Sequence, residues 1–414
     1  MKRHNRFWAL GCFILSGLLL TPASAQVQYQ HTDLDVLLGI DSPYEKKMSV
    51  ASAINDIGHV TGYYEVHIAD RPIPQKRIGF IYRPESGVEE FEAPNDWSVK
   101  TLDLNDNDEV IGLWEDPQGN IGSFVYRGGQ FENLDTFKKV YRINNEGDIV
   151  GVMAKARGAA LDSTVAILKR DHTVVDILDG VTDCDESVAG DCGLNRIDFD
   201  YWKQIGDFNS FDRWSDDKAQ AVDLNQNDEI IFSLQNNSVL SGCFKYGVYS
   251  YTPSVGVRYL MDKQFCMTPA GSGGMTSLSI NTNGSVLISW TLGGWAPFGE
   301  AQLYTTDGKN MTPGTVLDSA NLPPEGLFDY NSIFYNYPQF HTINDSNIIA
   351  GKHRTVFSIT DYYQVYMNSD FLHAGDLPSI TDINNSNTIV GYRDGLKKKA
   401  FVSSQETLHK DLGQ

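Results

Sequence analysis

The stretch Ile143-Asn144-Asn145-Glu146-Gly147-Asp148-Ile149-Val150-Gly151 decides the fold, because its pattern recurs along the chain. Aligned on the asparagine, the copies of this asparagine phrase start at Asn55, Asn105, Asn144, Asn225, Asn281, Asn344 and Asn384. A branched aliphatic residue precedes each asparagine. Three positions after it stands Gly, Asp or Asn, which tolerate positive φ, and five positions after it stands Val or Ile. The phrase predicts a strand, a tight turn and a second, antiparallel strand.

A second pair of strand-like runs follows most copies, for example 79–82 with 88–91 and 123–126 with 130–134. Each unit is therefore expected to contain four short antiparallel strands. The asparagines are 50, 39, 81, 56, 63 and 40 residues apart, and the shortest spacings match the ~40–50 residues of a four-stranded propeller blade. A β-solenoid has shorter rungs, and an immunoglobulin-like array needs ~100 residues per domain. We predict an all-β fold, a single β-propeller.

About seven blades are expected, with six or eight as alternatives. The 81-residue gap after Asn144 is about two periods long, and Leu194-Asn195 partly imitates the phrase. Position five after Asn195 is Asp200, which breaks the strand half of the pattern. The gap is interpreted as a long insertion at about 181–220, and an eighth, degenerate blade is the alternative.

The first 25 residues are typical of a secretory signal peptide. Lys2, Arg3 and Arg6 precede an apolar run, and Ala23-Ser24-Ala25 forms a small-residue cleavage site. Cleavage would leave a propeller domain at 26–414 and change the formal net charge from −20 to −23, because three basic residues and no acidic ones are removed. An exported protein, periplasmic or extracellular, is expected. The acidic charge disfavours nucleic acid as a partner, and no later segment is apolar for long enough to span a membrane.

Four cysteines follow the signal segment: Cys184, Cys192, Cys243 and Cys266. An even number in an exported chain predicts two disulfides. Cys184 with Cys192 would close a small loop inside the insertion, and Cys243 with Cys266 would join two segments of the fourth unit. Zinc is disfavoured, because the spacings contain no Cys-x2-Cys pair and no histidine stands near them.

The phrase Ile-Asn-x-x-Gly-x-Ile-Val-Gly, followed by a strand with Ala-Phe or a variant, resembles the HAF repeat of exported bacterial proteins. The best copies begin at Ile143 and Ile383, and Lys399-Ala400-Phe401 supplies the later element. The resemblance covers most of 50–404. The units at Asn225 and Asn281 depart from it, with Phe232 and Ile288 where the others have glycine. It implies an exported, propeller-like repeat protein and supplies no catalytic residues.

The repeated asparagine itself is interpreted as structural. Asp103-Leu104-Asn105-Asp106-Asn107-Asp108 resembles an acidic calcium loop, but the position of a later ligand is Ile111. An asparagine that folds its side chain onto the turn backbone explains the repeat more simply. Catalytic elbows, metalloprotease helices and phosphate-binding glycine loops are missing from the sequence. No catalytic residue, metal or cofactor is predicted.

Aromatic residues beside carboxylates in the insertions provide the candidate ligand-binding residues: Tyr201, Trp202, Asp212, Trp214, Asp216, Asp217, Trp295 and Tyr330. Aromatic faces next to acids suit stacking on sugar rings or holding cations. The alternative is that these rings only pack the loops onto the blades. The first functional hypothesis is a non-enzymatic propeller that binds a glycan, peptide or envelope protein. The others are a polysaccharide hydrolase or lyase with carboxylates at the axial channel, and a purely structural role.

Overall fold

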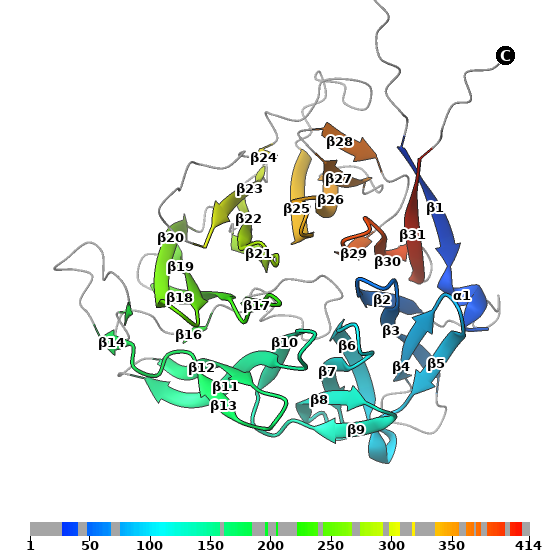
Figure 1. Cartoon of the computed structure of the whole chain (residues 1–414), viewed down its shortest axis with the longest axis horizontal. Coiled ribbons are helices and arrows are strands. Elements are labelled where there is room, and N and C mark those ends of the chain that lie inside the picture. Colours follow the sequence, from blue (N-terminus) through cyan, green and yellow to red (C-terminus); the bar gives the residue numbers. More distant parts are fainter. Residues whose placement is uncertain are drawn as a thin grey trace, which may run out of the picture.

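Each copy of the asparagine phrase forms the innermost hairpin of its own antiparallel sheet, and the sheets are arranged around a central axis (Figure 1). This computed structural model describes residues 27–39, 48–67, 75–157, 161–183, 195–197, 204–205, 222–238, 243–266, 274–292, 298–306, 317–318, 336–355, 362–367, 370–373, 379–393 and 398–407. The predicted all-β propeller of mostly four-stranded antiparallel blades is confirmed. Position three after each asparagine has the predicted positive φ, at Gly58, Asp108, Gly147, Asp228, Gly284, Asn347 and Asn387.

Within the described ranges, six sheets have four strands each and a seventh has five. In chain order the first three are β2 (Ser49–Ile54), β3 (Val60–His67), β4 (Gln75–Arg83) and β5 (Gly87–Phe91); β6 (Ser98–Leu104), β7 (Val110–Glu115), β8 (Ile121–Arg127) and β9 (Gln130–Asn133); and β10 (Lys139–Ile143), β11 (Ile149–Arg157), β12 (Leu161–Leu168) and β13 (Val174–Asp176). The five-stranded sheet comes fourth: β16 (Gln204–Ile205), β17 (Val222–Leu224), β18 (Ile230–Ser238), β19 (Cys243–Thr252) and β20 (Gly256–Cys266).

The fifth and sixth sheets are β21 (Gly274–Ile280), β22 (Ser285–Leu292), β23 (Phe298–Thr305) and β24 (Leu317–Asp318); and β25 (Asn336–Ile343), β26 (Ile349–Thr355), β27 (Tyr362–Met367) and β28 (Asp370–His373). The last sheet joins both ends of the described chain. Its strands are β29 (Ser379–Ile383), β30 (Ile389–Arg393), β31 (Lys399–Thr407) and β1 (Val27–Asp33). Because β1 pairs with β31 along its whole length, the first strand closes the circle of blades.

Apolar side chains fill the space between neighbouring sheets. Between the first two, for example, Ala53, Ile81 and Phe91 pack against Val99 and Phe124. Similar clusters join the second sheet to the third and the third to the fourth. Each blade thus buries both of its faces, which explains why the Val or Ile of the phrase is fully buried in every copy.

Glycine at position seven after the asparagine is coupled to a β-bulge in the innermost strand. In five sheets this strand bulges three residues before the asparagine. A Cβ at Gly112 would lie 2.2 Å from the carbonyl oxygen of Lys100 and 2.7 Å from the Phe124 ring. The two sheets with Phe232 and Ile288 instead pair in direct register at this point. The described residues of β17 have no bulge, and the bulge of β21 lies farther from the turn, between Met275 and Ser277.

The remaining elements are short. The described residues around Asn195 form a two-residue parallel pair, β14 (Thr182–Asp183) with β15 (Arg196–Ile197), rather than the hairpin of an eighth blade. The helices are α1 (Leu34–Leu37) and the 3-10 turn η1 (Pro94–Asp96). Among the described residues, no helix has the length and apolar character needed to cross a membrane. The predicted signal segment lies outside the described residues.

Strand register bears on one of the two predicted disulfides. Cys243 and Cys266 are direct partners across β19 and β20, and Cα atoms of such partners lie ~4.5–5.5 Å apart, within the range that a disulfide spans. We therefore expect peptide mapping of the protein by mass spectrometry under non-reducing conditions to recover a linked Cys243–Cys266 peptide. A Cys243 peptide linked to Cys184 or Cys192 would contradict this pairing. Those two cysteines lie outside the described residues.

Candidate functional site

The side chain of each phrase asparagine binds its own turn and the next blade. Asn55 Oδ1 accepts a hydrogen bond from the backbone N–H of His59 at 2.8 Å, and Asn55 Nδ2 donates to the carbonyl oxygen of Asn105 at 3.0 Å. The same donation to the following asparagine carbonyl is made by Asn105, Asn225, Asn281, Asn344 and Asn384. Asn384 donates to Asn55 across the closure of the propeller. We call this circle the asparagine ring.

One member departs from this pattern. Asn144 Nδ2 donates to Asp228 Oδ1 at 2.9 Å, the residue three positions after the next asparagine. Position three of the next turn is also an acceptor at two other junctions: Asn281 Nδ2 donates a second hydrogen bond to Asn347 Oδ1, and Asn344 Nδ2 donates one to Asn387 Oδ1. Where glycine stands there instead, at Gly147 and Gly284, the spare N–H of Asn105 or Asn225 binds a glutamate on its own turn, Glu109 or Glu229. From the second to the sixth junction, turn residues therefore vary together so that the buried amide keeps its hydrogen-bond partners.

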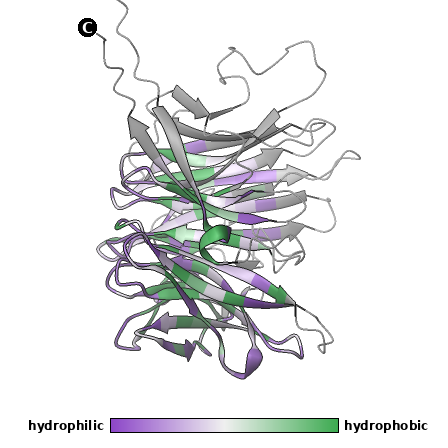
Figure 2. Ribbon diagram, turned by 90° about the vertical axis from the view of Figure 1, so that its right-hand side faces the viewer, coloured by the Kyte–Doolittle hydropathy of each residue, from purple (hydrophilic) through white to green (hydrophobic). Residues whose placement is uncertain are grey.

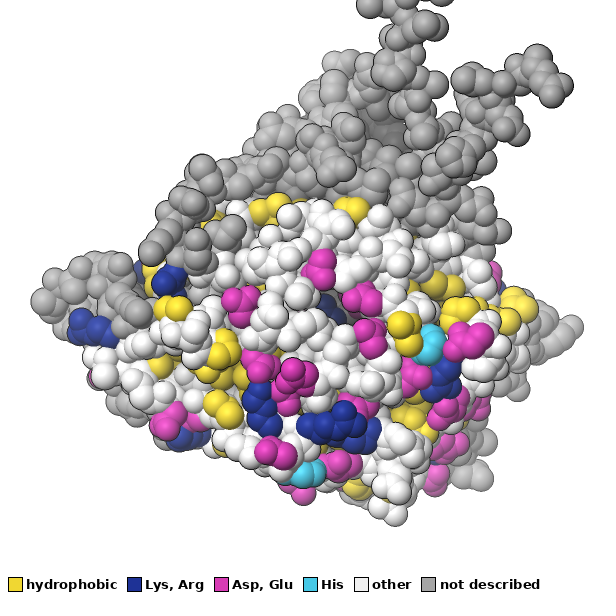
Figure 3. All heavy atoms as spheres, in the orientation of Figure 1, with side chains coloured by type: hydrophobic (Ala, Val, Ile, Leu, Met, Phe, Trp, Pro, Cys, Tyr) yellow, Lys and Arg dark blue, Asp and Glu magenta, His cyan; other side chains and the backbone are white. Residues whose placement is uncertain are grey.

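The residue after each asparagine builds a rim above the ring. Asp56 N–H donates to Asp106 Oδ1 at 3.0 Å, and Asp106 N–H donates to Asn145 Oδ1 at 3.0 Å. Equivalent bonds link Asn145 to Gln226, Thr282 to Asp345, Asp345 to Asn385, and Asn385 to Asp56. Figure 3 shows acidic side chains gathered around the central hollow on this face. We call it the phrase face; its hydrophilic turns line one side of the molecule in Figure 2.

In four of the seven copies the residue two positions before the asparagine is charged, and these four residues form a cluster on the axis. The Arg142 guanidinium is 2.8 Å from Asp103 Oδ1 and 2.8 Å from Asp223 Oδ1, and 3.8 Å from Asp382 Oδ2. Each aspartate also accepts a backbone N–H of an innermost strand, from Ile143, Ile280 or Ile54. Burial alone would lower the pKa of Arg142, but the three carboxylates raise it well above its ordinary value. Arg142 therefore joins four blades as a permanent cation.

These layers enclose an axial cavity of about 120 Å³. Its lining includes Asp103, Arg142 and Asp382 at depth, and Asp56 and Asp345 at the rim. Burial raises the pKa of Asp56, and the charges of Asp106 and Asp345 raise it further, against hydrogen bonds from Asn385 that lower it. A carboxyl whose pKa is raised on folding favours the folded state most at low pH, and this contribution is lost as pH rises through the raised value. The rim thus carries some unfavourable charge at neutral pH.

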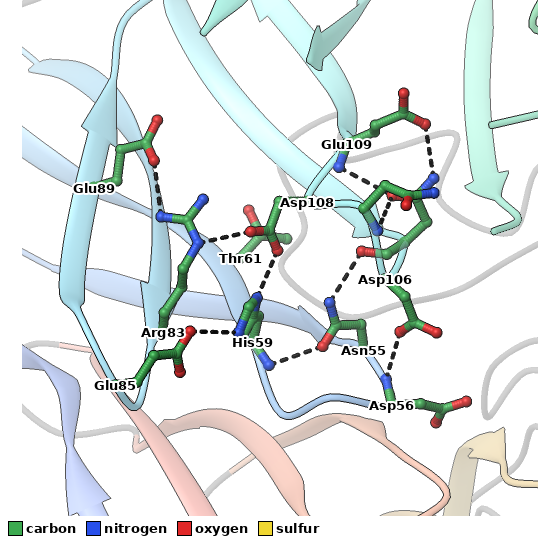
Figure 4. Close-up of polar contacts among 12 residues, drawn as sticks. Asn55, Asp56, His59, Thr61, Arg83, Glu85, Glu89, Asp106, Asp108 and Glu109 are labelled. Atoms are coloured by element: carbon green, nitrogen blue, oxygen red, sulfur yellow. Dashed lines mark hydrogen bonds and ion pairs between the residues drawn. The ribbon is translucent and has the colours of Figure 1, made fainter. Parts of the chain in front are cut away.

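The junction between the first two blades holds a second charged network (Figure 4). His59 Nδ1 lies 2.7 Å from Asp108 Oδ1, and His59 Nε2 lies 3.1 Å from Glu85 Oε1. Arg83 binds the other oxygen of Asp108 at 2.6 Å and Glu89 at 2.8 Å. Asp108 is the residue with positive φ in the second phrase, so this network fixes one turn against its neighbour. Its contacts fit a structural role.

One acidic group has the spacing of metal ligands. Carboxylate oxygens of Glu146, Asp148 and Asp228 lie within 4.8 Å of one another. The Lys169 ammonium binds both Asp148 and Asp228, so two of the three carboxylates already share a cation of the chain itself. These contacts make Lys169 a structural counter-ion and give no support for metal binding.

The sequence-predicted binding residues Tyr201, Trp202, Asp212, Trp214, Asp216, Asp217, Trp295 and Tyr330 all lie outside the described residues. The seven asparagines are described, and each is buried. Sequence reasoning missed Arg142. The signal was available: Asp103, Asp223 and Asp382 stand two residues before their asparagines, at the position that Arg142 occupies in the third copy. Opposite charges at one repeat position predict contact at the axis of a closed toroid.

Fold and site together define a β-propeller repeat protein with a polar, self-paired axis. No family model matches the sequence, and no curated protein matches it either. Solved structures show distant similarity. The propeller domain of the Trilobed protease from Pyrococcus furiosus is 8% identical, with a TM-score of 0.49 over 89% of this chain and 100% of that one. A puromycin-hydrolysing peptidase of Mycobacterium tuberculosis is 10% identical, with a TM-score of 0.48 over 89% and 53%. YCF48 bound to D1 peptide is 8% identical, with a TM-score of 0.43 over 93% and 99%.

Replacing Asn105 with alanine tests the asparagine ring. Asn105→Ala removes the acceptor for the N–H groups of Asn107 and Glu109 and the donor to Asn144. We expect the free energy of unfolding to fall by about 2–4 kcal/mol, because buried groups lose their partners. Urea denaturation measures the change. Asn107→Ala is the matched control: its side chain is exposed, it donates only to Asn145 among the described residues, and it should cost under about 1 kcal/mol. Equal losses would contradict the ring.

Replacing Arg142 with methionine tests the axial cluster. Arg142→Met leaves Asp103, Asp223 and Asp382 buried without their cation, so we expect a loss of about 3–5 kcal/mol at pH 7. The pKa of each aspartate should rise in the variant, so the deficit should shrink as pH falls from 7 to 5 and the carboxylates take up protons. Urea denaturation at several pH values measures this. A deficit independent of pH would show that Arg142 acts through packing alone.

Proposed function

We propose that the protein is an exported, non-enzymatic propeller that binds a glycan, peptide or envelope protein through its aromatic-acidic segments. The support comes from where the described strands lead. Successive strands of an antiparallel blade run in opposite directions, so the connections between them alternate between the two faces of the propeller. The phrase turns occupy one face, so the connections from second to third strand, and from each blade to the next, belong to the opposite face. We call it the insertion face.

The described strand ends on both sides of two aromatic-acidic segments lie at the insertion face, and for the third the strand that follows begins there. Trp295 stands between the end of β22 and the start of β23, and Tyr330 stands between β24 and β25. Trp202 stands two residues before β16. This strand pairs with Leu234 and Gln235, in the half of β18 remote from the phrase turn. The pairing of β16 is the observation that carries the proposal, because it puts Gln204, two residues after Trp202, at the insertion-face end of β18, whereas Asn195 of the same segment binds Val255 and Val257 at the β19–β20 turn on the phrase face.

The axial part of the phrase face suits binding less well. Its polar groups are engaged with one another in the asparagine ring, the rim and the Arg142 cluster. The axial cavity of about 120 Å³ is well below the ~300–1,000 Å³ of most small-molecule sites.

Catalysis by axial carboxylates is the second hypothesis, and one observation bears on it. Asn385 Nδ2 donates to Asp56 Oδ2 at 2.8 Å and to Asp345 Oδ2 at 2.9 Å, so the two carboxylates are less than about 6 Å apart. This separation is near the ~5–5.5 Å of retaining glycosidases. The Asn385 amide, however, already binds both acids at the place where a substrate would lie, so the geometry favours a structural pair.

The binding proposal predicts separate effects on ligand and stability. A glycan array and a pull-down of envelope proteins with the mature chain would first identify a ligand. Trp202→Ala and Trp214→Ala should then weaken its binding by about tenfold or more, with thermal midpoints within a few degrees of wild type. Ile57→Ala, at an exposed residue of the phrase face, is the matched control and should leave binding unchanged. A large fall in the thermal midpoint of the tryptophan variants would instead indicate packing.

A further inference from the structure

A cavity of about 340 Å³ opens on the phrase face between the fourth and fifth blades. Its lining includes Glu229, Thr252, Arg258 and Thr306. This volume is within the ~300–1,000 Å³ of small-molecule sites. It is separate from the axial cavity, and the asparagine phrase supplies only Glu229 to it.

The turn acids of the first three junctions each have a cation from the end of a third strand. In each blade, the Val or Ile five positions after the phrase asparagine pairs with a residue of the third strand. The residues that directly follow these third-strand partners are equivalent: Arg83, Arg127, Lys169 and Thr252. Arg83 binds Asp108, and Lys169 binds Asp148 and Asp228. Arg127 lies 3.9 Å from Glu109. At the fourth junction this position is Thr252, whose buried hydroxyl has no hydrogen-bond partner within the described residues.

The second junction is the closest match to the fourth. Glu109 there corresponds to Glu229, and Gly147 corresponds to Gly284. Arg170 of the second junction binds Glu109 at 2.8 Å, and its side chain would lie 3.4 Å from a Cβ at Gly147. The residue equivalent to Arg170 is Thr306, which would lie 2.8 Å from a Cβ at Gly284. Arg127 and Arg170 of the second junction, which we call sealed, are therefore replaced by Thr252 and Thr306 at the fourth junction, which we call open.

These replacements leave Glu229 without a cation. Its carboxylate accepts the Asn225 amide at 2.7 Å, and no cationic side chain among the described residues pairs with it. Arg258 lines the same cavity, yet in the described part of the chain it forms no ion pair with Glu229 or another acid. The cavity thus presents an acid and a base that do not neutralise each other. A ligand with both charges could satisfy both groups.

We propose that this cavity is a binding site for a small zwitterion of the amino-acid class. A guanidinium or ammonium group of the ligand would occupy the place that Arg170 fills at the second junction and bind Glu229. Its carboxylate would bind the Arg258 guanidinium, whose planar fork suits carboxylates. The Thr252 and Thr306 hydroxyls supply further hydrogen-bonding groups. This site is independent of the proposed insertion-face function.

Isothermal titration of the full chain with L-arginine tests the proposal, and agmatine, which lacks the carboxylate, separates the two charges. L-arginine should bind measurably, and agmatine more weakly. Glu229→Gln should weaken both ligands by about tenfold or more, the usual effect of losing a charged hydrogen bond. Arg258→Gln should weaken L-arginine and leave agmatine unchanged. Thr252→Arg, which restores the cation found at Arg127, should abolish binding of both and raise the thermal midpoint.

Glu109→Gln is the matched control, because it makes the same change at the sealed second junction. It should leave L-arginine binding unchanged even if it lowers stability. The proposal is overturned if wild-type protein gives no binding heat at millimolar L-arginine, or if Glu229→Gln binds as well as wild type. Equal weakening by Glu109→Gln and Glu229→Gln would also overturn it, by showing a nonspecific charge effect.

Discussion

The hydrogen bond from each phrase asparagine to the next blade is the constraint on which the propeller depends. Its Oδ1 atom satisfies N–H groups of its own turn, and its Nδ2 atom reaches a neighbour that is 39 to 63 residues away in sequence at the regular steps. Only a short amide side chain offers both an acceptor and a donor at this position. Aspartate would lose the donor, which explains why asparagine is unvaried in all seven copies although other turn positions change.

Compensation between neighbouring turns allows that variation. At the second and fourth junctions, glycine at position three occurs with Glu109 or Glu229 on the preceding turn, where the glutamate accepts the spare amide hydrogen. At the seventh junction Gly58 occurs with Thr388 instead. Asn347 and Asn387 accept it directly at other junctions. The bulge and the position-seven glycine vary together in the same way. The residue at one repeat position therefore depends on the residue across the blade junction, because either blade can supply the hydrogen-bond partner of a buried polar group.

The sequence predicted the turn and strand positions within each hairpin, but it did not predict which distant residues each hairpin contacts. Positive φ at position three and a buried strand at position five followed from residue type alone. The closing strand β1 carries no phrase and pairs with residues more than 360 positions away, so no local pattern could place it. Arg142 was missed because its role needs all seven copies to be viewed as one layer around an axis. The inference from aromatic-acidic composition concerns residues outside the described ranges and stays a prediction.

Charge at the blade junctions follows a single rule that explains both the sealed and the open ones. An acid on a phrase turn is largely buried, and its desolvation is offset by a cation at the end of the third strand. Arg83, Arg127 and Lys169 provide that cation from the same position. The fifth and sixth junctions have Ser285 and Ile348 in place of the acid, so they need no cation at this position. Glu229 breaks the rule by keeping the acid without the cation. A conformationally fixed carboxylate in that state gains most from a cation supplied from outside the chain.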